Sequence, residues 1–490
     1  MHGDRARAAD LAALTVMVAL ALAWPLVAPP IGTHGEAREG LVVQDIVRRG
    51  HWVLPVRNGE MPSKPPLYHW IAAAGAALLG LSDAAVRLPS ALAAWAVLVA
   101  VYLVGARGGG RACGWLAVAA LAGMHGFVEA ASEARVDMVF AAGVTIALAA
   151  FLCWHRTENA WARALCYGAV AAAVLTKGPA GAVLVGLVIV AFLLVERRLD
   201  RLRALWSWRL AALVLVVDLG WYAAATWIGG REFLARQILH ENVDRFVGRG
   251  VFGMHGGRSR LAMVENLATD LLPWNLVLVA AAARWWRGAR EDEIGRFLHV
   301  WWVTVVAVFT AAYGKRGVYL LPLYPAVALL AGRALGSVLT VWRDPARVPE
   351  PIVAALGRVG AGSPARALVV LVVAIDLGVL LIGQGVRVRR AGRGSLVPFA
   401  DEVAARVPAG SPLVADASLD ESDLLVLAYR LGRPLPRAAC RPGRHRLLTP
   451  RPGVPAVAAL VAARRHGVPV ALVRDTEATC ALALDREDDR

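Results

Sequence analysis

The chain has 490 residues, of which 58% are hydrophobic, and its mean hydropathy is +0.54. This composition excludes an ordinary soluble domain, and several apolar runs reach the roughly 18 residues needed to cross a bilayer. The formal net charge is +16, but short basic loops between spans explain this excess better than a nucleic-acid partner does. The sequence therefore predicts a polytopic α-helical membrane protein that binds no nucleic acid.

The apolar runs predict about 11–13 transmembrane helices. The first run, residues 11–31, lacks a small-residue cleavage site before Thr33, so we expect a retained helix with its N-terminus inside. Residues 67–81 form a shorter segment that is typical of an interfacial helix or an imperfect span. Further spans are expected at residues 86–104, 113–128, 138–154, 164–175, 180–195, 210–228, 271–283, 297–312, 318–342 and 367–383.

The loops divide into two classes in this topology. The basic loops near residues 107, 197, 284 and 343 all fall on one side of the membrane, as the positive-inside rule requires. Two long polar stretches, residues 32–66 and 229–270, fall on the other side. Residues 1–385 are thus predicted to form a transmembrane domain, with its chemistry on the side opposite the basic loops.

Residues 386–490 have a different composition and predict a small soluble α/β domain on the same outer side. Cys440 and Cys480 lie in this tail and could form a disulfide outside the cytoplasm, or remain free thiols. Helices are expected at residues 398–407, 420–431 and 457–467, and strands at residues 412–415, 445–449, 468–473 and 480–484.

Lysine is rare in this chain. Only three of the 53 basic residues are lysines, namely Lys64, Lys177 and Lys315. Lysine supplies a compact point charge that arginine does not, so each is a candidate for a functional position, although three lysines could also remain by chance. Lys64 precedes two prolines that start the next helix at the membrane surface, where an ammonium group suits a lipid phosphate. Its alternative role is that of a snorkelling interfacial lysine.

Two acids near the predicted outer face are candidate general bases. Glu36 follows the first apolar run, and a carboxylate near a low-dielectric region can have a raised pKa; alternatively, it is a solvated loop acid. Asp137 lies at the outer end of a span, on one helical face with Glu129 and Glu133. Ionisable residues at a membrane boundary are costly unless they are paired or functional, so Asp137 is a candidate for the chemistry. The alternative is that Arg135 simply pairs with one of these three acids.

The second long polar stretch holds metal and phosphate candidates. His240, Glu241 and His255 carry metal-ligating groups, but their spacing matches no established zinc pattern. Arg258 and Arg260 could bind phosphate. We expect no required cofactor, and a divalent ion with His255 as a ligand is the alternative.

Another segment, GKRGVYLLPLYP, begins a span with two prolines inside it. Lys315 and Tyr319 in this segment are candidate phosphate ligands. The alternative is a kinked helix start with an aromatic belt.

Several motifs taken together resemble a known family. GEAREG, RRGHWVLPVRNGE, SKPPLYHWIAA, VRLPSALAAW, TKGPAG, HENVDRF and KRGVYLLPLYPA follow one another within residues 1–335. They resemble the glycosyltransferases related to the lipid A aminoarabinose transferase and to protein O-mannosyltransferases. The resemblance implies a GT-C fold, a sugar donor on polyprenyl phosphate (usually undecaprenyl phosphate), and inverting transfer at the periplasmic face without a nucleotide sugar.

The resemblance also implies roles for individual residues. Glu36 matches the acidic motif of the first loop, Asp137 the acid of the second outer loop, and Lys64 the phosphate-binding lysine. Where many relatives carry acids, this chain has Gly35 and Ser63, so either Glu36 or Asp137 could be the base. The full set of predicted site residues is Glu36, Asp137, Lys64, Arg258, Arg260, Lys315 and Tyr319, with Arg38, His240, Glu241, His255 and Lys177 as further candidates.

The sequence thus predicts a glycosyltransferase that uses a lipid-phosphate-linked sugar. Its acceptor would be a hydroxyl or phosphate on a lipid or glycan, and a protein O-glycosyltransferase is the alternative within the class. A transporter or lipid flippase is the alternative from another class, but the sequence shows no repeated halves and its polar residues cluster at one face. Gly35 also leaves open a scaffold without activity.

Overall fold

The structure, a computed structural model, contains two compact units. Unit 1 comprises Met1–Leu26, Ser63–Tyr68 and Arg87–Gln384, and unit 2 comprises Val27–Pro62, His69–Val86 and Gly385–Arg490. The described residues are 10, 12–13, 15, 29–61, 63–244, 247, 262–287, 291–313, 316–342, 364–392, 396–406, 415–416, 419–438, 446–448, 459–465 and 468–474.

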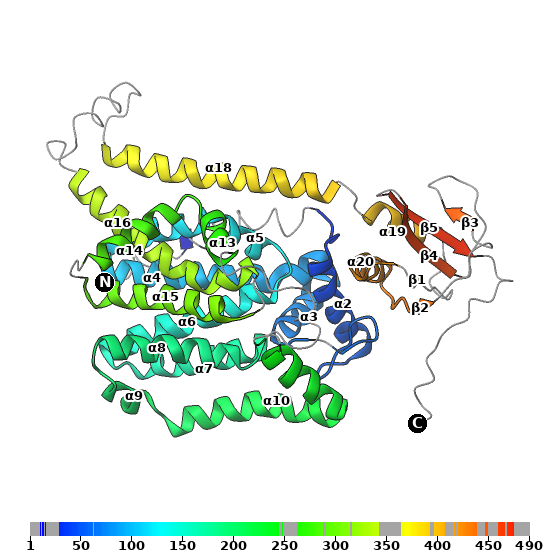
Figure 1. Ribbon diagram of the computed structural model, residues 1–490, viewed down its shortest axis with the longest axis horizontal. Coiled ribbons are helices and arrows are strands. Elements are labelled where there is room, and N and C mark those ends of the chain that lie inside the picture. Colours follow the sequence, from blue (N-terminus) through cyan, green and yellow to red (C-terminus); the bar gives the residue numbers. More distant parts are fainter. Residues whose placement is uncertain are drawn as a thin grey trace. The chain divides into compact units, whose positions relative to one another are not determined.

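Unit 1 is built of helices, and several of them run side by side, among them α4, α6, α7, α8 and α15 (Figure 1). The first residues of α4 and the last residues of α18 belong to unit 2. In chain order the helices are α4 (Asp83–Ala122), α5 (His125–Ser132), α6 (Val136–Thr157), α7 (Ala160–Lys177), α8 (Ala180–Val195), α9 (Asp200–Leu205), α10 (Trp208–Leu234), the π-helix η1 (Ala235–Asp244), α13 (Ala262–Asp270), α14 (Asn275–Trp286), α15 (Glu293–Ala311), the 3-10 helix η2 (Gly317–Leu323), α16 (Tyr324–Trp342) and α18 (Pro364–Gly392).

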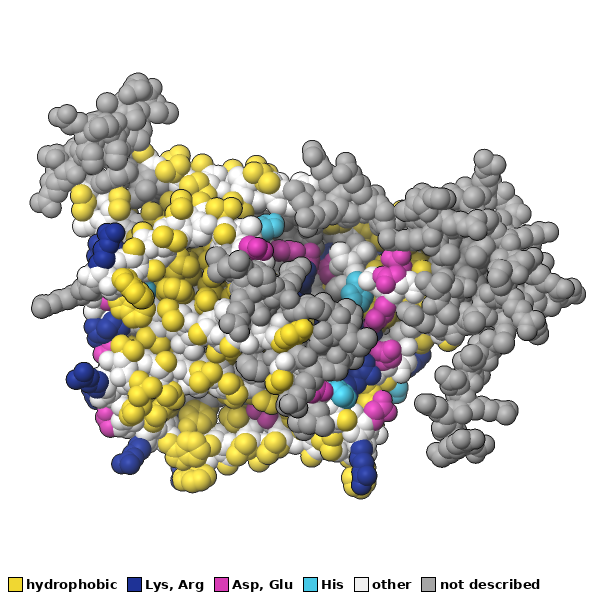
Figure 2. All heavy atoms as spheres, viewed as in Figure 1, with side chains coloured by type: hydrophobic (Ala, Val, Ile, Leu, Met, Phe, Trp, Pro, Cys, Tyr) yellow, Lys and Arg dark blue, Asp and Glu magenta, His cyan; other side chains and the backbone are white. Residues whose placement is uncertain are grey.

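The predicted class of polytopic helical membrane protein is confirmed. Hydrophobic side chains cover much of the visible surface of these helices, and lysine and arginine side chains gather along one edge (Figure 2). Among the described residues, five helices are long and apolar enough to cross a membrane, namely Asp83–Ala122, Val136–Thr157, Trp208–Gln237, Glu293–Ala311 and Gly317–Val341. Three shorter apolar helices, Leu67–Leu79, Ala180–Val195 and Val370–Gly383, accompany them. The predicted first span, residues 11–31, lies mostly outside the described residues.

The predicted basic turn near residue 107 is present within α4. Gly110 interrupts the helical backbone with a φ of 84°, a conformation that glycine adopts without strain. The two halves of α4 then approach each other closely, because a Cβ on Gly105 would lie 2.9 Å from the Gly114 Cα. The Tyr102 and Trp115 rings also meet across this turn, with centroids 5.4 Å apart.

The first long polar stretch is not the loop that the sequence suggested, because much of it forms α2 (His34–Arg49). Thr33 caps the helix by accepting a hydrogen bond from the Glu36 backbone N–H at 3.4 Å. The helix ends at Gly50, whose φ of 73° is the left-handed conformation typical of a C-terminal cap. The sequence T-x-x-E before an apolar run is a capping-box signature that could have predicted this helix. The short apolar segment near residue 70 is also helical, as α3 (Leu67–Leu79).

The tail contributes helices and strands to unit 2. They are α19 (Val397–Arg406), β1 (Ala415–Asp416), α20 (Glu421–Leu431), β2 (Arg437–Ala438), β3 (Arg446–Leu448), β4 (Ala459–Arg465) and β5 (Val468–Arg474). β1 pairs with β2 in parallel, and β5 lies between β3 and β4 in an antiparallel sheet. The division of the tail into a separate α/β domain remains a prediction.

The predicted helix at residues 457–467 is wrong, because this segment forms β4. Its alanine-rich sequence favours a helix locally, but the strand pairs with β5 along its whole length, from Ala459 opposite Arg474 to Arg465 opposite Val468. Tertiary pairing therefore overrides the local preference. Residues 480–484, Cys440 and Cys480 lie outside the described residues.

Helix α20 packs against α2 within unit 2. A Cβ on Gly40 would lie 2.4 Å from the Tyr429 ring, so only glycine permits this approach. The Gln44 side-chain amide donates to the Tyr429 carbonyl at 2.9 Å, and the Tyr429 hydroxyl donates to Asp83 at 2.6 Å. These contacts fix the helix that carries Glu36 against the C-terminal segment.

Candidate functional site

Lys64 lies in unit 1 and forms an ion pair with Glu241. Its Nζ donates to the Glu241 Oε2 at 2.9 Å, and each side chain is 11% exposed. Two candidates predicted separately, 177 positions apart, are therefore brought together. An ammonium group has three donors, so Lys64 can keep this partner while it donates to an oxygen of a bound phosphate.

Lys177 and Asp137 form a second ion pair in unit 1. Asp137 stands in the first turn of α6 and Lys177 in the last turn of α7, and the lysine donates to the carboxylate. The Lys177 Nζ also lies 4.5 Å from the centre of the Tyr319 ring and 5.0 Å from that of Phe140. The structure thus joins three predicted candidates, Asp137, Lys177 and Tyr319, into one cluster.

Additional positive charge surrounds Asp137. The positive charges of Arg135 and Lys64 also act on its carboxylate. Arg135 forms an ion pair with Glu133 at 2.6 Å. Burial alone would lower the pKa of the Arg135 guanidinium, but the negative charges of Glu133 and Glu129 outweigh burial and raise this pKa. The predicted alternative that Arg135 pairs with one of the three acids is confirmed, because its partners are Glu133 and Glu129. Asp137 pairs with Lys177 instead. The cluster therefore offers cationic groups to an anionic ligand.

Glu36 belongs to unit 2, in the first turn of α2. Its side chain is buried, with 3% exposed, and lies 3.4 Å from the Thr33 hydroxyl. The alternative of a solvated loop acid is therefore wrong. A Cβ built on the neighbouring Gly35 meets no atom within 4 Å among the residues that the structure describes.

Glu39, a further acid of α2, was not among the residues predicted from the sequence. Glu39 is buried and accepts hydrogen bonds from Arg38 at 2.6 Å and from the His69 Nε2 at 2.7 Å. Burial alone would raise the pKa of this carboxyl, but Arg38 and His69 hold it well below its usual range. Arg38, a predicted site candidate, thus belongs to a buried hydrogen-bond network in unit 2.

This network predicts an acid-dependent contribution to stability. A carboxyl whose pKa is lowered by folding stabilises the folded state above its usual pKa of 4.5, and this contribution is lost as the pH falls below that value. Glu39→Gln is expected to cost about 3–5 kcal/mol near pH 7, because it breaks a buried ion pair. Thermal unfolding in detergent from pH 7 to pH 3 measures this difference, which should shrink below pH 4.5. An equal deficit at every pH would contradict the assignment.

Asp270, at the end of α13, is a second acid that the sequence analysis missed. Burial raises its pKa, and the nearby Glu129 raises it further. The Tyr324 hydroxyl lies 3.5 Å from the Asp270 carboxylate, and a Cβ on Gly317 would lie 2.8 Å from it. The local sequence could not mark Asp270 as a site candidate, because the residues that surround its side chain come from η2 and α16.

The structure gives different results for the remaining predicted site residues. His240 is exposed and pairs with Asp244 one helical turn later, at 2.7 Å. Among the described residues, no three His, Cys, Asp or Glu side chains are close enough together to hold a metal ion. His255, Arg258, Arg260 and Lys315 lie outside the described residues.

Comparisons with known proteins agree with the predicted resemblance. Residues 63–221 match the sequence family described as dolichyl-phosphate-mannose-protein mannosyltransferase. The chain is 28% identical over 336 residues to undecaprenyl phosphate-alpha-4-amino-4-deoxy-L-arabinose arabinosyl transferase 1 of Pseudomonas fluorescens, covering 64% of this chain and 56% of that protein. It is 28% identical over 319 residues to the corresponding transferase of Pseudomonas aeruginosa, covering 62% and 57%. The chain thus spans little more than half the length of these relatives.

Solved structures show the fold. The crystal structure of ArnT from Cupriavidus metallidurans bound to undecaprenyl phosphate has a TM-score of 0.74 at 18% identity, over 95% of this chain and 97% of that chain. The archaeal oligosaccharyltransferase AglB from Archaeoglobus fulgidus has a TM-score of 0.55 at 13% identity, over 86% and 64%. The predicted resemblance is confirmed, and the chain is a multi-pass membrane protein with the GT-C fold.

Proposed function

We propose that this chain, with its GT-C fold, is a glycosyltransferase that moves a sugar from a polyprenyl-phosphate carrier to a hydroxyl or phosphate on a lipid or glycan. We place the reaction at the periplasmic face of the bacterial inner membrane. The observation that carries the proposal is the cluster of Lys64, Lys177 and Tyr319 around carboxylates in unit 1. Relatives whose names specify an undecaprenyl-phosphate donor support it.

The cationic groups suit the leaving group of this reaction. When the bond between the sugar and the phosphate breaks, the phosphate carries a growing negative charge. Preorganised cations in a site sheltered from water stabilise such charge strongly. We assign this role to Lys64, which is only 11% exposed, and a supporting role to Lys177.

The two candidate bases receive different roles. Asp137 is already paired with Lys177, so we propose that it orients this lysine beside Tyr319. Glu36 is then the group that removes the proton from the acceptor hydroxyl. Inverting transfer follows, because the acceptor oxygen attacks the anomeric carbon from the side opposite the departing phosphate.

The names of the relatives indicate which sugar donor and which acceptor to test first. Undecaprenyl-phosphate-linked 4-amino-4-deoxy-L-arabinose is the first donor to test, since the relatives' names specify it. A phosphorylated envelope lipid such as lipid A is the first acceptor. A protein acceptor is the second candidate, because residues 63–221 match a protein mannosyltransferase family.

Analysis of cell envelopes tests the acceptor class. Lipids and proteins from cells with and without this chain are compared by mass spectrometry. A lipid species that carries one added sugar only when the chain is present is expected. The same mass added to peptides at Ser or Thr would replace the lipid acceptor by a protein. Identical envelopes would contradict both.

We also propose that transfer needs no divalent metal ion, because Lys64 and Lys177 supply positive charge to the phosphate. Removal of metal by EDTA is expected to change the transfer rate by less than about twofold, whereas loss of a metal that stabilised the phosphate would cost far more. The measurement is the initial rate before and after chelation. A large loss that Mn²⁺, Mg²⁺ or Zn²⁺ restores would contradict the proposal.

A further inference from the structure

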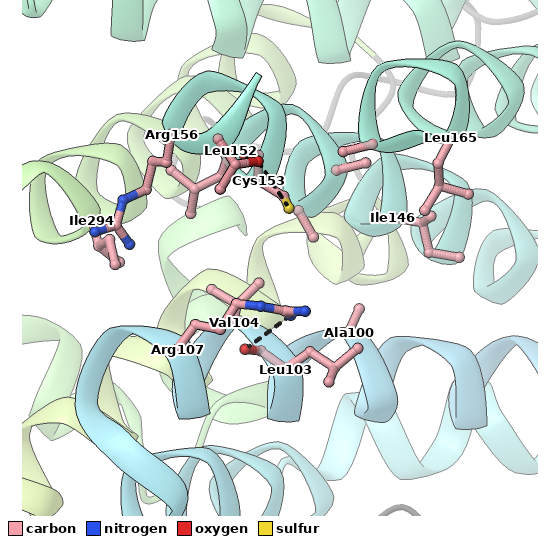
Figure 3. Close-up of a pocket in the computed structure, with 14 residues that line it drawn as sticks. Ala100, Leu103, Val104, Arg107, Ile146, Leu152, Cys153, Arg156, Leu165 and Ile294 are labelled. Atoms are coloured by element: carbon pink, nitrogen blue, oxygen red, sulfur yellow. Dashed lines mark hydrogen bonds between the residues drawn. The ribbon is translucent and has the colours of Figure 1, made fainter. Parts of the chain in front are cut away.

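A cavity of about 490 Å³ lies in unit 1 between α4, α6 and α7. Its walls are mostly apolar, and Figure 3 shows side chains of α4 facing those of α6 and α7 across it. The cavity reaches the surface of α7, where Leu165 is 54% exposed. Its volume falls within the usual range for small-molecule sites. The apolar lining includes Ala100, Leu103, Val104, Ile146, Leu152 and Leu165.

Two arginines line this otherwise apolar cavity, Arg107 from α4 and Arg156 from α6 (Figure 3). Arg107 is exposed and donates to the Leu103 carbonyl at 3.5 Å. In the part of the chain that the structure describes, no carboxylate lies within ion-pair distance of Arg107. Arg156 is 45% exposed and shares Glu293 with His155. Both guanidinium groups can therefore accept an anionic partner.

A polar hollow of about 470 Å³ shares Arg156 and Thr157 with the apolar cavity. Arg198 and Arg201 also line this hollow. The two hollows are lined by four arginines and two glutamates, and Arg198 also pairs with Asp200 at 3.3 Å, so one positive charge is in excess. An apolar space that leads to a basic one fits a molecule with an apolar chain and an anionic head.

The basic end of the cavity is far from the candidate transfer site of unit 1. Asp137 is in the first turn of α6, whereas Arg156 is in its last turn, and 22 residues of helix span roughly 33 Å. The N-terminal segment contacts α4 elsewhere, through Asp10 at Arg111 and Thr15 at Trp95. The basic end of the cavity is therefore separate from the transfer site proposed above.

We propose that this cavity binds an anionic phospholipid, with an acyl chain between α4, α6 and α7 and the lipid phosphate at Arg107 and Arg156. Basic pockets between transmembrane helices bind anionic lipid head groups in this way. A free phosphate would leave the apolar cavity empty, and a zwitterionic lipid would leave the excess positive charge uncompensated. Dioleoyl phosphatidylglycerol has both required parts and serves as the probe.

Cys153 provides a direct reporter, because it lines the cavity. Purified full-length protein in detergent is treated with N-ethylmaleimide, and peptide mass spectrometry follows Cys153, with the buried Cys113 and Cys166 as internal references. Phosphatidylglycerol is expected to protect Cys153 at a concentration at least about tenfold below that of phosphatidylethanolamine with the same chains, because only the former carries net charge. Glycerophosphoglycerol, which has no acyl chains, is expected to give no protection.

The variants test the head-group contact. In the double variant Arg107→Gln/Arg156→Gln, the concentrations at which the two lipids protect Cys153 are expected to lie within about twofold of each other. Arg284→Gln, at an exposed arginine of α14, is the matched control and should keep the preference. Native mass spectrometry counts the phosphatidylglycerol retained by each variant and supplies the answer if Cys153 does not react.

Three results would overturn the proposal. Equal protection by both phospholipids would exclude the charge contact. Stronger protection by undecaprenyl phosphate than by phosphatidylglycerol would assign the cavity to a polyprenyl lipid. If phosphatidylglycerol neither protects Cys153 nor stays bound in native mass spectrometry, the cavity does not bind this lipid. None of these measurements depends on sugar transfer, so failure here is distinct from failure of the proposed transferase activity.

Discussion

Sugar transfer is expected to fall by about two to four orders of magnitude when Glu36 is replaced by glutamine, the range that a positioned general base contributes. Glutamine keeps the size of the side chain and can also complete a capping box, so α2 should still form. The expected loss is in kcat, with the KM for the lipid donor little changed, because the base acts on the acceptor hydroxyl. Initial rates with purified protein in proteoliposomes measure both parameters.

Two controls separate chemistry from helix capping. Thr33→Ala removes the cap of α2 and should cost about 0.5–2 kcal/mol of stability, with the transfer rate within about threefold of wild type. Gly35→Asp places an acid where the sequence resemblance implies one, in a position with room for a Cβ, and should restore part of the activity of Glu36→Gln. Full activity in Glu36→Gln, combined with an inactive Asp137→Asn, would transfer the role of base to Asp137.

Replacing Lys64 by alanine is expected to lower transfer by about 10²–10³-fold, the usual cost of removing one group that stabilises developing negative charge. The same change should weaken inhibition by the product, undecaprenyl phosphate, because this ligand carries the charge that Lys64 meets. Product-inhibition constants and initial rates, measured on the same preparation, check both effects.

The ion-pair partner of Lys64 supplies the matched control. Lys64→Ala leaves the Glu241 carboxylate without the ammonium at 2.9 Å, which could disturb the fold. Glu241→Gln breaks the same pair but keeps the lysine, so it should cost much less activity than Lys64→Ala. Lys64→Arg keeps the charge with a different geometry, so its transfer rate should lie between those of the wild type and Lys64→Ala. Equal losses in Lys64→Ala and Glu241→Gln would assign the lysine a structural role only.

The sequence identified the class of protein and several of the charged residues that the structure joins in ion pairs. Apolar runs of sufficient length predicted the membrane helices, because crossing hydrocarbon imposes both length and composition. The rarity of lysine led to Lys64 and Lys177, and the structure gives each an acidic partner that was also a candidate. These properties are local or compositional, so a sequence displays them directly.

The pairing of these residues could not be predicted from the sequence. Lys177 is 40 positions from Asp137, and Lys64 is 177 positions from Glu241. Only the packing of distant helices decides such partners. Glu39 was missed for the same reason, since its partner His69 lies on another helix. The strand at Ala459–Arg465 depends on β5 rather than on its own sequence.

The most direct test of the proposed activity is the reaction itself. Purified protein in proteoliposomes receives synthetic undecaprenyl-phosphate-linked 4-amino-4-deoxy-L-arabinose and lipid A, and mass spectrometry follows both lipids. We expect equal amounts of free undecaprenyl phosphate and of lipid A with one added sugar, and neither product from Lys64→Ala over the same period. Intact donor with wild-type protein, whether lipid A, glycan or peptide acceptors are offered, would contradict the assignment as a glycosyltransferase.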